Sequence, residues 1–439
     1  MSRRIAYLLG LVLAVAMLAA GCGDDNGGDG GGGGGGGGTQ EEGTTEGAKV
    51  IDPASMENAS GTVKYCTGQD TTGERKDSIE RFEKANPNIK IQLVEFPASA
   101  DEQRNQFIQR QEARSDDCDV FGADVVWTAE FAQQKWLYDL TPYVESRKDE
   151  FIPSTLETVH YDGKYWGVPK DTNAGFLYYR TDQVDSLPET WQAVYEDAKA
   201  KDGIVYQGAS YEGLTVNFLE MAYAAGGSVL NEDGTKPTIN SPENLRALEF
   251  MVNGIKEGAA PKSVVTMMEE ESQRAFVAGR ATYLRNWPYV YAIGQAENSK
   301  IRNKFEVAPY PPFEGGKTAG ILGGLNLVIS AYASNPGGAL KFIDFATNEE
   351  SMNRAASQFA LPPALASSYE DPEVQKALPF ASELKQAVEQ AAPRPVTPVY
   401  SQVSQAIYEN VNAALAGQVS PEEALKNAER DMQQALETF

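Results

Sequence analysis

Histidine and cysteine are nearly absent from this sequence, whose 439 residues include one histidine and three cysteines. A metal centre built on several histidines therefore lacks its ligands, and a Ser-His-Asp triad has only His160 to use. Basic residues are also few, with 38 lysines and arginines against 62 aspartates and glutamates, so the net charge is −24. Because phosphate backbones are bound by basic surfaces, we expect no nucleic-acid partner.

Catalytic signatures are missing as well. His160 stands alone in the stretch 159–163, where a surface turn is its expected role. The sequence has no phosphate-binding loop, which fits a receptor and not a motor. Acidic residues are plentiful, but no motif sets two of them across a cleft with separated pKa values, as a glycosidase requires. We therefore expect no catalytic residue, no metal and no other cofactor.

The N-terminus carries the clearest targeting signal. Arg3 and Arg4 precede an apolar run over residues 5–20. Such a run is short for a membrane span and is typical of a signal peptide. It ends in a Leu-Ala-Ala-Gly-Cys sequence that resembles the lipobox of bacterial lipoproteins, so we expect a signal peptide over residues 1–22 and lipidation of Cys22. An ordinary signal peptide that contains a cysteine by chance is the alternative.

A glycine-rich tract follows, with an unbroken run of glycines over residues 30–38. A segment with so few apolar side chains does not bury a core and behaves as a flexible tether. We expect this tether to cover residues 23–60. The chain is then an exported protein, held by lipid on the outer face of the cytoplasmic membrane or in the periplasm.

Cys66 and Cys118 are the only cysteines left in the folded part. In an oxidising compartment an isolated pair favours a disulfide, with two buried free thiols as the alternative. Closing a loop of this length stabilises the fold by about 4 kcal/mol in the chain-entropy model.

The folded part begins as an α/β structure. Its length suits two or three domains, and the hydrophobic share of 41% suits a large core. Apolar alternation and helical spacing predict strands at 63–66 and 89–96 and one further strand that includes 119–121 and 124–127, with helices at 74–85 and 101–115 between them. Strands separated by helices imply a parallel sheet.

The rest of the chain is richer in helices. Extended segments are predicted at 166–169, 176–180 and 325–330, and helices at 215–225, 241–258, 270–278 and 338–347. Ser241 followed by Pro242 is a helix start, with the serine as N-cap. A proline-dense stretch at 307–312 suits a crossing between lobes, and prolines at 393–398 interrupt the helical C-terminal part.

Several stretches together resemble a known family. They follow one another with the order and spacing of family 1 extracellular solute-binding proteins, the maltose-binding-protein-like group, and within it they look most similar to the trehalose/maltose-binding branch. These stretches are 78–87 with the strand after it, 124–132, 165–169, 175–180, 285–289, 323–327 and 394–395.

The resemblance implies a fold and a function. Members have a two-lobed α/β fold of the type II periplasmic-binding-protein kind, hinged around a ligand cleft. The expected crossings lie near Pro169, Pro309 and 361–363. Lobe 1 then comprises 61–169 and 310–362, and lobe 2 comprises 170–309 and 363–439. The implied role is that of a monomeric substrate-binding protein of an ABC importer, which delivers an oligosaccharide, such as the disaccharides trehalose or maltose, to permease subunits.

The candidate site follows from sugar chemistry and from the resemblance. Sugar C–H faces stack on aromatic rings, while vicinal hydroxyls suit carboxylates, amides and guanidinium groups. The expected ligand-binding residues are Gln69, Asp70, Asp124, Trp127, Asn173, Trp287, Tyr289, Gly323, Gly324 and Arg394. Purely structural roles are the alternatives: a turn cap for Asp124, core packing for Trp127, a bulge for Gly323 and Gly324, and a salt bridge for Arg394.

Two positions depart from the trehalose/maltose branch. Asn173 stands where that branch commonly has aspartate, and Leu325 stands where it commonly has tryptophan. Both changes alter the cleft and put trehalose itself in doubt. The competing hypotheses are an exported carbohydrate-active enzyme and a binding protein for a polyamine, an amino acid or iron. The aromatic residues of the candidate loops favour sugar, and the lack of histidine disfavours iron.

Overall fold

A computed structural model describes residues 45–231, 234–395 and 397–437. The predicted signal peptide, the lipidation site Cys22 and the tether up to residue 44 lie outside the described residues. Among the helices it does describe, none combines the length and apolar character needed to cross a bilayer.

The first of two main sheets has five strands in the order β2-β1-β3-β11-β6. Strand β1 runs parallel to β2 and β3, which confirms the predicted parallel unit, whereas β11 is antiparallel to β3 and β6. The strands are β1 (Gly61–Gly68), β2 (Ile89–Phe96), β3 (Val120–Asp124), β6 (Val168–Ala174) and β11 (Leu322–Ile329).

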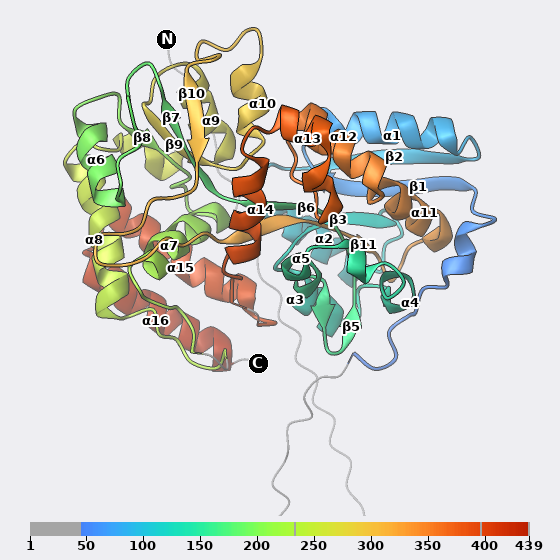
Figure 1. Cartoon of the computed structure of the whole chain (residues 1–439). Helices are drawn as coiled ribbons and strands as arrows, with labels where there is room; N and C mark the ends of the chain where they lie inside the picture. The colour runs from blue at the N-terminus through green and yellow to red at the C-terminus, as the bar shows by residue number, and fades with distance from the viewer. Residues whose placement is uncertain (1–44, 232–233, 396, 438–439) are drawn as a thin grey trace, which may run out of the picture. The chain divides into compact units, whose positions relative to one another are not determined.

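The second main sheet has four strands in the order β10-β7-β9-β8. These are β7 (Phe176–Arg180), β8 (Ile204–Val205), β9 (Tyr283–Asn286) and β10 (Phe305–Ala308). A separate hairpin joins β4 (His160–Tyr161) to β5 (Lys164–Tyr165). In Figure 1 the first sheet lies on the right and the second on the left. We call each sheet with its helices the first and the second lobe.

Helices cover both sheets. In Figure 1, α1 and α11 lie with the first sheet, while α6, α8 and α16 lie on the side of the second. The helices are α1 (Glu74–Ala85), α2 (Ala100–Glu112), α3 (Thr128–Gln133), α4 (Thr141–Val144), α5 (Pro153–Glu157), α6 (Trp191–Lys199), α7 (Glu212–Ala224), α8 (Pro242–Lys256), α9 (Glu269–Val277), α10 (Val290–Gln295), α11 (Pro336–Ala346), α12 (Glu349–Phe359), α13 (Pro372–Ala377), α14 (Ala381–Gln390), α15 (Tyr400–Leu415) and α16 (Pro421–Glu437), with short 3-10 turns η1 (Pro53–Met56), η2 (Lys148–Glu150), η3 (Lys262–Thr266) and η4 (Ser367–Glu370).

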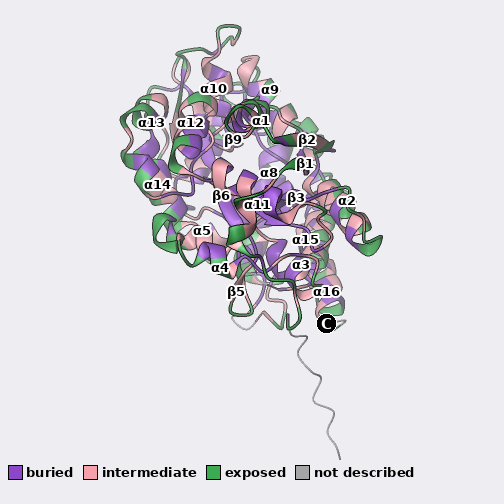
Figure 2. Cartoon of the chain, turned by 90° about the vertical axis from the view of Figure 1, so that its right-hand side faces the viewer, coloured by how far each residue is buried: buried purple, intermediate pink, exposed green. Residues whose placement is uncertain are grey.

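The apolar core consists of three clusters. Two lie within the first lobe, and a larger one surrounds the second sheet and continues to α12–α14 of the first lobe. Helix α7 is apolar on nearly every side and is buried along almost its whole length, as expected for a helix that other elements enclose. Figure 2 shows the buried residues gathered inside and the exposed ones on outer helix faces.

The chain passes between the sheets at three places. Strand β6 ends at Ala174 and belongs to the first sheet, while β7 begins at Phe176 in the second, so the first passage is at Gly175 and not near Pro169. The second passage is the segment 309–321 between β10 and β11.

The third passage also differs from the expected place. The segment around Pro362 stays on the first sheet, because its carbonyl accepts the Thr172 N–H of β6 at 3.0 Å. Ala392 still pairs with the start of β11, and only 393–398 leads on to α15, which packs on α7. We therefore propose lobe boundaries at Gly175, at 309–321 and at 393–398.

The strand predicted over 124–127 is shorter than expected. Strand β3 ends at Asp124, whose carboxylate accepts the Val126 N–H at 3.2 Å while its carbonyl accepts the Trp127 N–H at 3.1 Å. These bonds close a turn, and Trp127 becomes the N-cap of α3. Aspartate bonding its own following backbone competes with strand pairing, so the apolar Val125 and Val126 do not extend β3.

The folded part begins earlier than predicted. Residues 45–60, which we expected within the tether, pack on the first lobe. Thr45 is fully buried, and both its N–H and its hydroxyl donate to Asp162 in the β4–β5 turn, at 3.0 and 2.6 Å. Further along, Ile51 is buried and its N–H donates to the carbonyl of Asp139. We call residues 45–56 the N-terminal strap.

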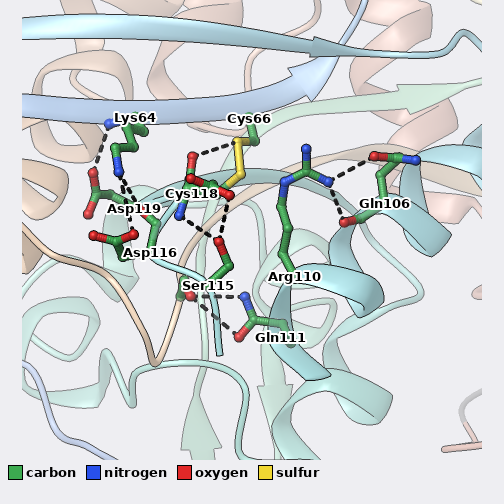
Figure 3. Close-up of a disulfide and its surroundings, with 11 residues drawn as sticks. Lys64, Cys66, Gln106, Arg110, Gln111, Ser115, Asp116, Cys118 and Asp119 are labelled. Carbon is green, nitrogen blue, oxygen red and sulfur yellow. Dashed lines mark hydrogen bonds and ion pairs between the residues drawn. A yellow bond between two sulfur atoms is a disulfide. The ribbon is translucent and has the colours of Figure 1, made fainter. Parts of the chain in front are cut away.

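A disulfide joins Cys66 of β1 to Cys118, as predicted, with a Cα–Cα distance of 5.8 Å across a sequence separation of 52 (Figure 3). The bridge is buried in the core of the first lobe. It ties β1 to the segment that leads into β3, the strand that ends at Asp124.

Candidate functional site

A cavity of about 220 Å³ lies where the two lobes meet. Both lobes supply its walls, and seven of the ten predicted ligand residues are among its lining: Asp124, Asn173, Trp287, Tyr289, Gly323, Gly324 and Arg394. Residues that the sequence did not point to complete it, namely Ala98, Ala100, Tyr211, Glu212, Gly213, Val216, Glu269 and Leu361.

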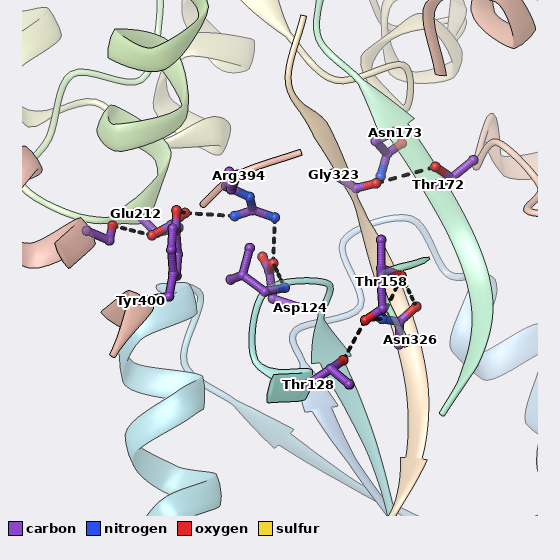
Figure 4. Close-up of polar contacts among 12 residues, drawn as sticks. Asp124, Thr128, Thr158, Thr172, Asn173, Glu212, Gly323, Asn326, Arg394 and Tyr400 are labelled. Atoms are coloured by element: carbon purple, nitrogen blue, oxygen red, sulfur yellow. Dashed lines mark hydrogen bonds and ion pairs between the residues drawn. The ribbon is translucent and has the colours of Figure 1, made fainter. Parts of the chain in front are cut away.

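Arg394 is the central polar group of the cavity wall. Its guanidinium donates to Asp124 of the first lobe at 2.6 Å and to Glu212 of the second lobe at 2.7 Å (Figure 4). The side chain is only 5% exposed. Burial alone would lower the pKa of Arg394, but the two carboxylates beside it raise that pKa, so the guanidinium is held charged. Arg394 thus links both lobes at the cavity.

Glu212 was not predicted, although it is the best-connected acid of the site. Besides Arg394 it accepts the Tyr400 hydroxyl at 2.6 Å and also the hydroxyl of Ser404. Burial raises the pKa of Glu212, while Arg394 opposes that rise. Its backbone N–H donates to Asp101 of the first lobe at 3.0 Å. No local motif in the sequence marks Glu212, because its partners Arg394, Tyr400 and Ser404 lie far away in the chain.

Trp287 forms the aromatic wall. It follows β9, and its backbone is fixed by two hydrogen bonds: its N–H donates to the Asn286 side chain and its carbonyl accepts the Tyr178 hydroxyl, both at 2.8 Å. The ring edge lies against Gly323 of β11, where an added Cβ would be 3.1 Å from two ring carbons. Gly323 therefore makes room for the ring.

The backbone conformation at position 324 requires a glycine. Its φ of 142° is in the region that favours glycine, and a Cβ there would be 2.5 Å from the Asp171 carbonyl. The neighbouring Asn173 lines the cavity with its amide 3.5 Å from the Asp171 carboxylate. Leu325 is not among the lining residues and lies instead against Gly122 of β3. Leu325 therefore adds no ring to the cavity lining beside Gly323, Gly324 and Asn173.

Three predicted residues lie elsewhere. Trp127 is 6% exposed and packs in the core of the first lobe, with its ring centroid 5.8 Å from that of Phe131. Asp70 caps the start of α1, where its carboxylate accepts the Gly73 and Lys76 N–H groups at 2.8 and 3.1 Å. Gln69 lines a second cavity.

The second cavity adjoins the first at Ala98, Glu269 and Tyr289, which line both. Its volume is about 370 Å³, and it too has walls from both lobes. Glu269, another residue missed by the sequence, accepts the Tyr211 hydroxyl at 2.6 Å. The two cavities together form one cleft with carboxylates along it.

The chemistry of this cleft is that of polar recognition beside the aromatic side chains of Trp287, Tyr211 and Tyr289. Carboxylates and a guanidinium present several hydrogen-bonding atoms, and Trp287 presents an apolar surface. A ligand that carries both many hydroxyls and apolar C–H faces satisfies both walls at once.

Comparison with known proteins agrees with this geometry. The family described as bacterial extracellular solute-binding protein matches residues 68–353. The chain belongs to this family. A curated relative from Deinococcus radiodurans, named probable ABC transporter-binding protein, is 34% identical over 81% of this chain and 89% of its own length. The maltotriose-binding protein of Pyrococcus abyssi is 28% identical over 62% of this chain and 60% of its own length.

Solved structures of solute-binding proteins share the fold. The maltose-bound MalE3 of T. maritima is 36% identical, with a TM-score of 0.82 over 85% of this chain and 100% of its own. A Thermotoga lettingae solute-binding protein with bound α-D-tagatose is 24% identical, with a TM-score of 0.79 over 86% of this chain and 100% of its own. The predicted two-lobed α/β fold with a hinged cleft is therefore confirmed.

Proposed function

We propose that this solute-binding protein captures an oligosaccharide of about disaccharide size for an ABC importer. The observation that carries the proposal is the cavity between the lobes, which is lined by Trp287 and by the carboxylates held by Arg394. In this proposal the protein performs no chemistry on its ligand. Ligand binding is completed by lobe closure, the usual switch in two-lobed receptors.

In this proposal, different residues of the cavity bind the apolar and the polar parts of the sugar. The C–H face of one sugar ring stacks on Trp287. Its hydroxyls bond to Arg394 and to Asp124, Glu212 and Glu269, since charged partners make the stronger hydrogen bonds. Because Asp124 and Glu212 come from different lobes, a ligand that contacts both favours the closed arrangement.

Maltose is the disaccharide we favour over trehalose. A maltose-bound protein that is 36% identical shares the fold. The two departures from the trehalose/maltose branch also matter, because Asn173 carries no charge and Leu325 offers no ring. Both remove interactions that the resemblance associates with that branch, so the preference for maltose rests on the maltose-bound relative alone.

The location belongs to the proposal as well. The lipobox-like sequence ending at Cys22 supports lipid anchoring outside the cytoplasmic membrane. The partners are then the permease subunits of the importer. A single chain supplies both walls of the cavity, which supports a monomer.

A thermal-shift screen tests the ligand class. The full folded part is heated with maltose, trehalose, sucrose, cellobiose, longer glucans, single sugars, amino acids and polyamines. A ligand that binds only the folded state adds about 2.7 kcal/mol at a hundredfold excess over its Kd. We expect maltose to give the largest shift and to be recovered unchanged. A shift with polyamines or amino acids alone contradicts the sugar assignment, and recovery of glucose from maltose contradicts the receptor role.

A further inference from the structure

A buried ion pair lies directly behind the aromatic wall of the cleft. Arg285 of β9 and Glu220 of α7 are each 1% exposed. They form two hydrogen bonds of 2.8 and 2.5 Å, and the same guanidinium donates to Gln207 at 2.8 Å. Such a pair is costly to bury and adds little to stability compared with apolar packing. The contacts of this pair instead support a role in positioning a neighbouring side chain.

The guanidinium lies against the ring of Trp287. The Arg285 Cζ is 4.4 Å from the centroid of that ring. At this distance a planar guanidinium stacks on an aromatic face and is held there by cation–π attraction. Because one side of the ring meets Arg285 and its edge meets Gly323, the orientation of Trp287 in the cavity is fixed from both lobes.

The same ion pair touches the first passage between the lobes. A Cβ added at Gly175 would be 2.7 Å from Glu220 Oε1 and 2.8 Å from Arg285 Nη2. It would also be 2.0 Å from the hydroxyl of Tyr310, a residue of the second passage. Two of the three segments that join the lobes therefore lie against this pair.

We infer that Arg285, held by Glu220, is a positioning residue that sets the Trp287 ring for sugar stacking and couples the ring to the crossing at Gly175. The inference rests on the proposed sugar site. It assigns Arg285 no contact with the ligand and places its effect entirely on Trp287.

The first experiment is a double-mutant cycle on maltose affinity, measured by titration calorimetry. The variants are Arg285→Lys, Trp287→Leu and both together. Lysine keeps the charge but loses the planar stacking surface, so we expect affinity about tenfold weaker in Arg285→Lys. In the Trp287→Leu background the same change should cost at most about twofold, because the ring on which the guanidinium stacks is gone. Equal losses in both backgrounds overturn the inference.

Arg180→Lys is the matched control for this cycle. Arg180 lies in the same sheet, is 8% exposed and forms two hydrogen bonds of 2.6 Å with Asp182. It does not line the cavity. We expect its substitution to leave maltose affinity unchanged within about twofold. A loss as large as that of Arg285→Lys contradicts a specific positioning role.

The link to the crossing is tested with glycine variants. Gly175→Ala should displace the ion pair, change the tryptophan emission of the ligand-free protein and weaken maltose binding. Gly320→Ala is the control, since it lies in the second passage with no atom within 4 Å of an added Cβ. Equal behaviour of the two variants overturns the coupling.

Failure of the proposed function has a different signature. If the wild-type protein binds no sugar, the affinity cycle gives no result, but ligand-free emission still reports on the ring. An emission change that Arg285→Lys causes in wild type and not in Trp287→Leu then supports the positioning role alone. If Arg285→Lys leaves the emission of the wild type unchanged, the positioning role is contradicted whatever the ligand is.

Discussion

Asp171 lies one strand position beyond the buried Lys170 on β6, next to residues that line the cleft. Burial raises the pKa of its carboxyl group to about 6, although Lys170 and Arg75 oppose that rise. An acid with a raised folded-state pKa binds its proton more tightly when folded. Its charge therefore destabilises the fold increasingly as the pH rises from about 4 to about 6.

Replacing Asp171 with asparagine removes this dependence. We expect Asp171→Asn to be more stable than wild type by about 1–2 kcal/mol at pH 7.5, with a difference that vanishes near pH 4. Urea unfolding between pH 4 and pH 8 measures it. A difference that stays constant over this range rules out titration of Asp171 as its cause.

The two tryptophans singled out by the sequence lie in different settings, and a pair of variants separates them. Trp287→Ala removes the stacking surface, so we expect maltose affinity to fall by a factor of about ten or more. Trp127→Phe perturbs only the core of the first lobe and should leave affinity within about twofold while lowering the melting temperature. Titration calorimetry and thermal unfolding measure both. Comparable affinity losses from the two would remove Trp287 from the proposed site.

At this scale the sequence predicts best where a motif fixes the backbone. The Asn-Trp-Pro sequence places Trp287 in an extended stretch after β9, and it reaches the cavity. Glu212 and Tyr211 have no such marker, since their role depends on Arg394 and Glu269, far away in the chain. Trp127 shares a stretch with Asp124, yet the turn after Asp124 directs it into the core.

Helix α8 offers a test at the scale of the element. Its N-cap Ser241 accepts the Asn244 N–H at 3.2 Å, and Pro242 begins the helix, as predicted. Replacing a serine cap with alanine costs about 1 kcal/mol. We expect Ser241→Ala to lower the free energy of unfolding by that amount, measured with urea. Ser263→Ala, at an exposed position in η3, is the control and should have almost no effect; equal losses contradict the capping role.

Local patterns define elements well when both ends carry a signal. The helix Glu74–Ala85 and the strand Ile89–Phe96 have the predicted bounds, because Asn86-Pro87 separates them and their periodicities differ. The N-terminal strap has no periodicity at all. Thr45 and Ile51 are ordered by partners in the β4–β5 turn and at Asp139, and a window of sequence does not contain those partners.

The disulfide is best tested on the whole molecule. In the chain-entropy model, closing a loop with a separation of 52 residues contributes about 4 kcal/mol. We expect the double variant Cys66→Ala/Cys118→Ala to lose about that much stability in urea unfolding. Maltose affinity should be unchanged, because neither cysteine lines the cavity. Reduction of the wild type should reproduce the loss, and reduction of the double variant should add nothing.

Sequence patterns do not predict to which lobe each strand belongs. Strand β6 looks the same in sequence whether it pairs with β11 or with β7, and its pairing moves the crossing from Pro169 to Gly175. The segment around Pro362 likewise follows β6 through a main-chain bond, and main-chain bonds leave no trace in side-chain periodicity. The family resemblance predicted the two-lobed fold, whereas the lobe boundaries follow from the strand pairing in the structure.

The N-terminal strap has a mechanical consequence. Thr45 is clamped by Asp162 and Lys164 of the β4–β5 hairpin, and the strap runs on along the first lobe. In the proposed form anchored at Cys22, a force applied through the tether therefore enters the folded part at that hairpin. The second lobe lies outside this line of force. In the proposed lipid-anchored form, the second lobe can then close on ligand without loading the anchored end of the chain.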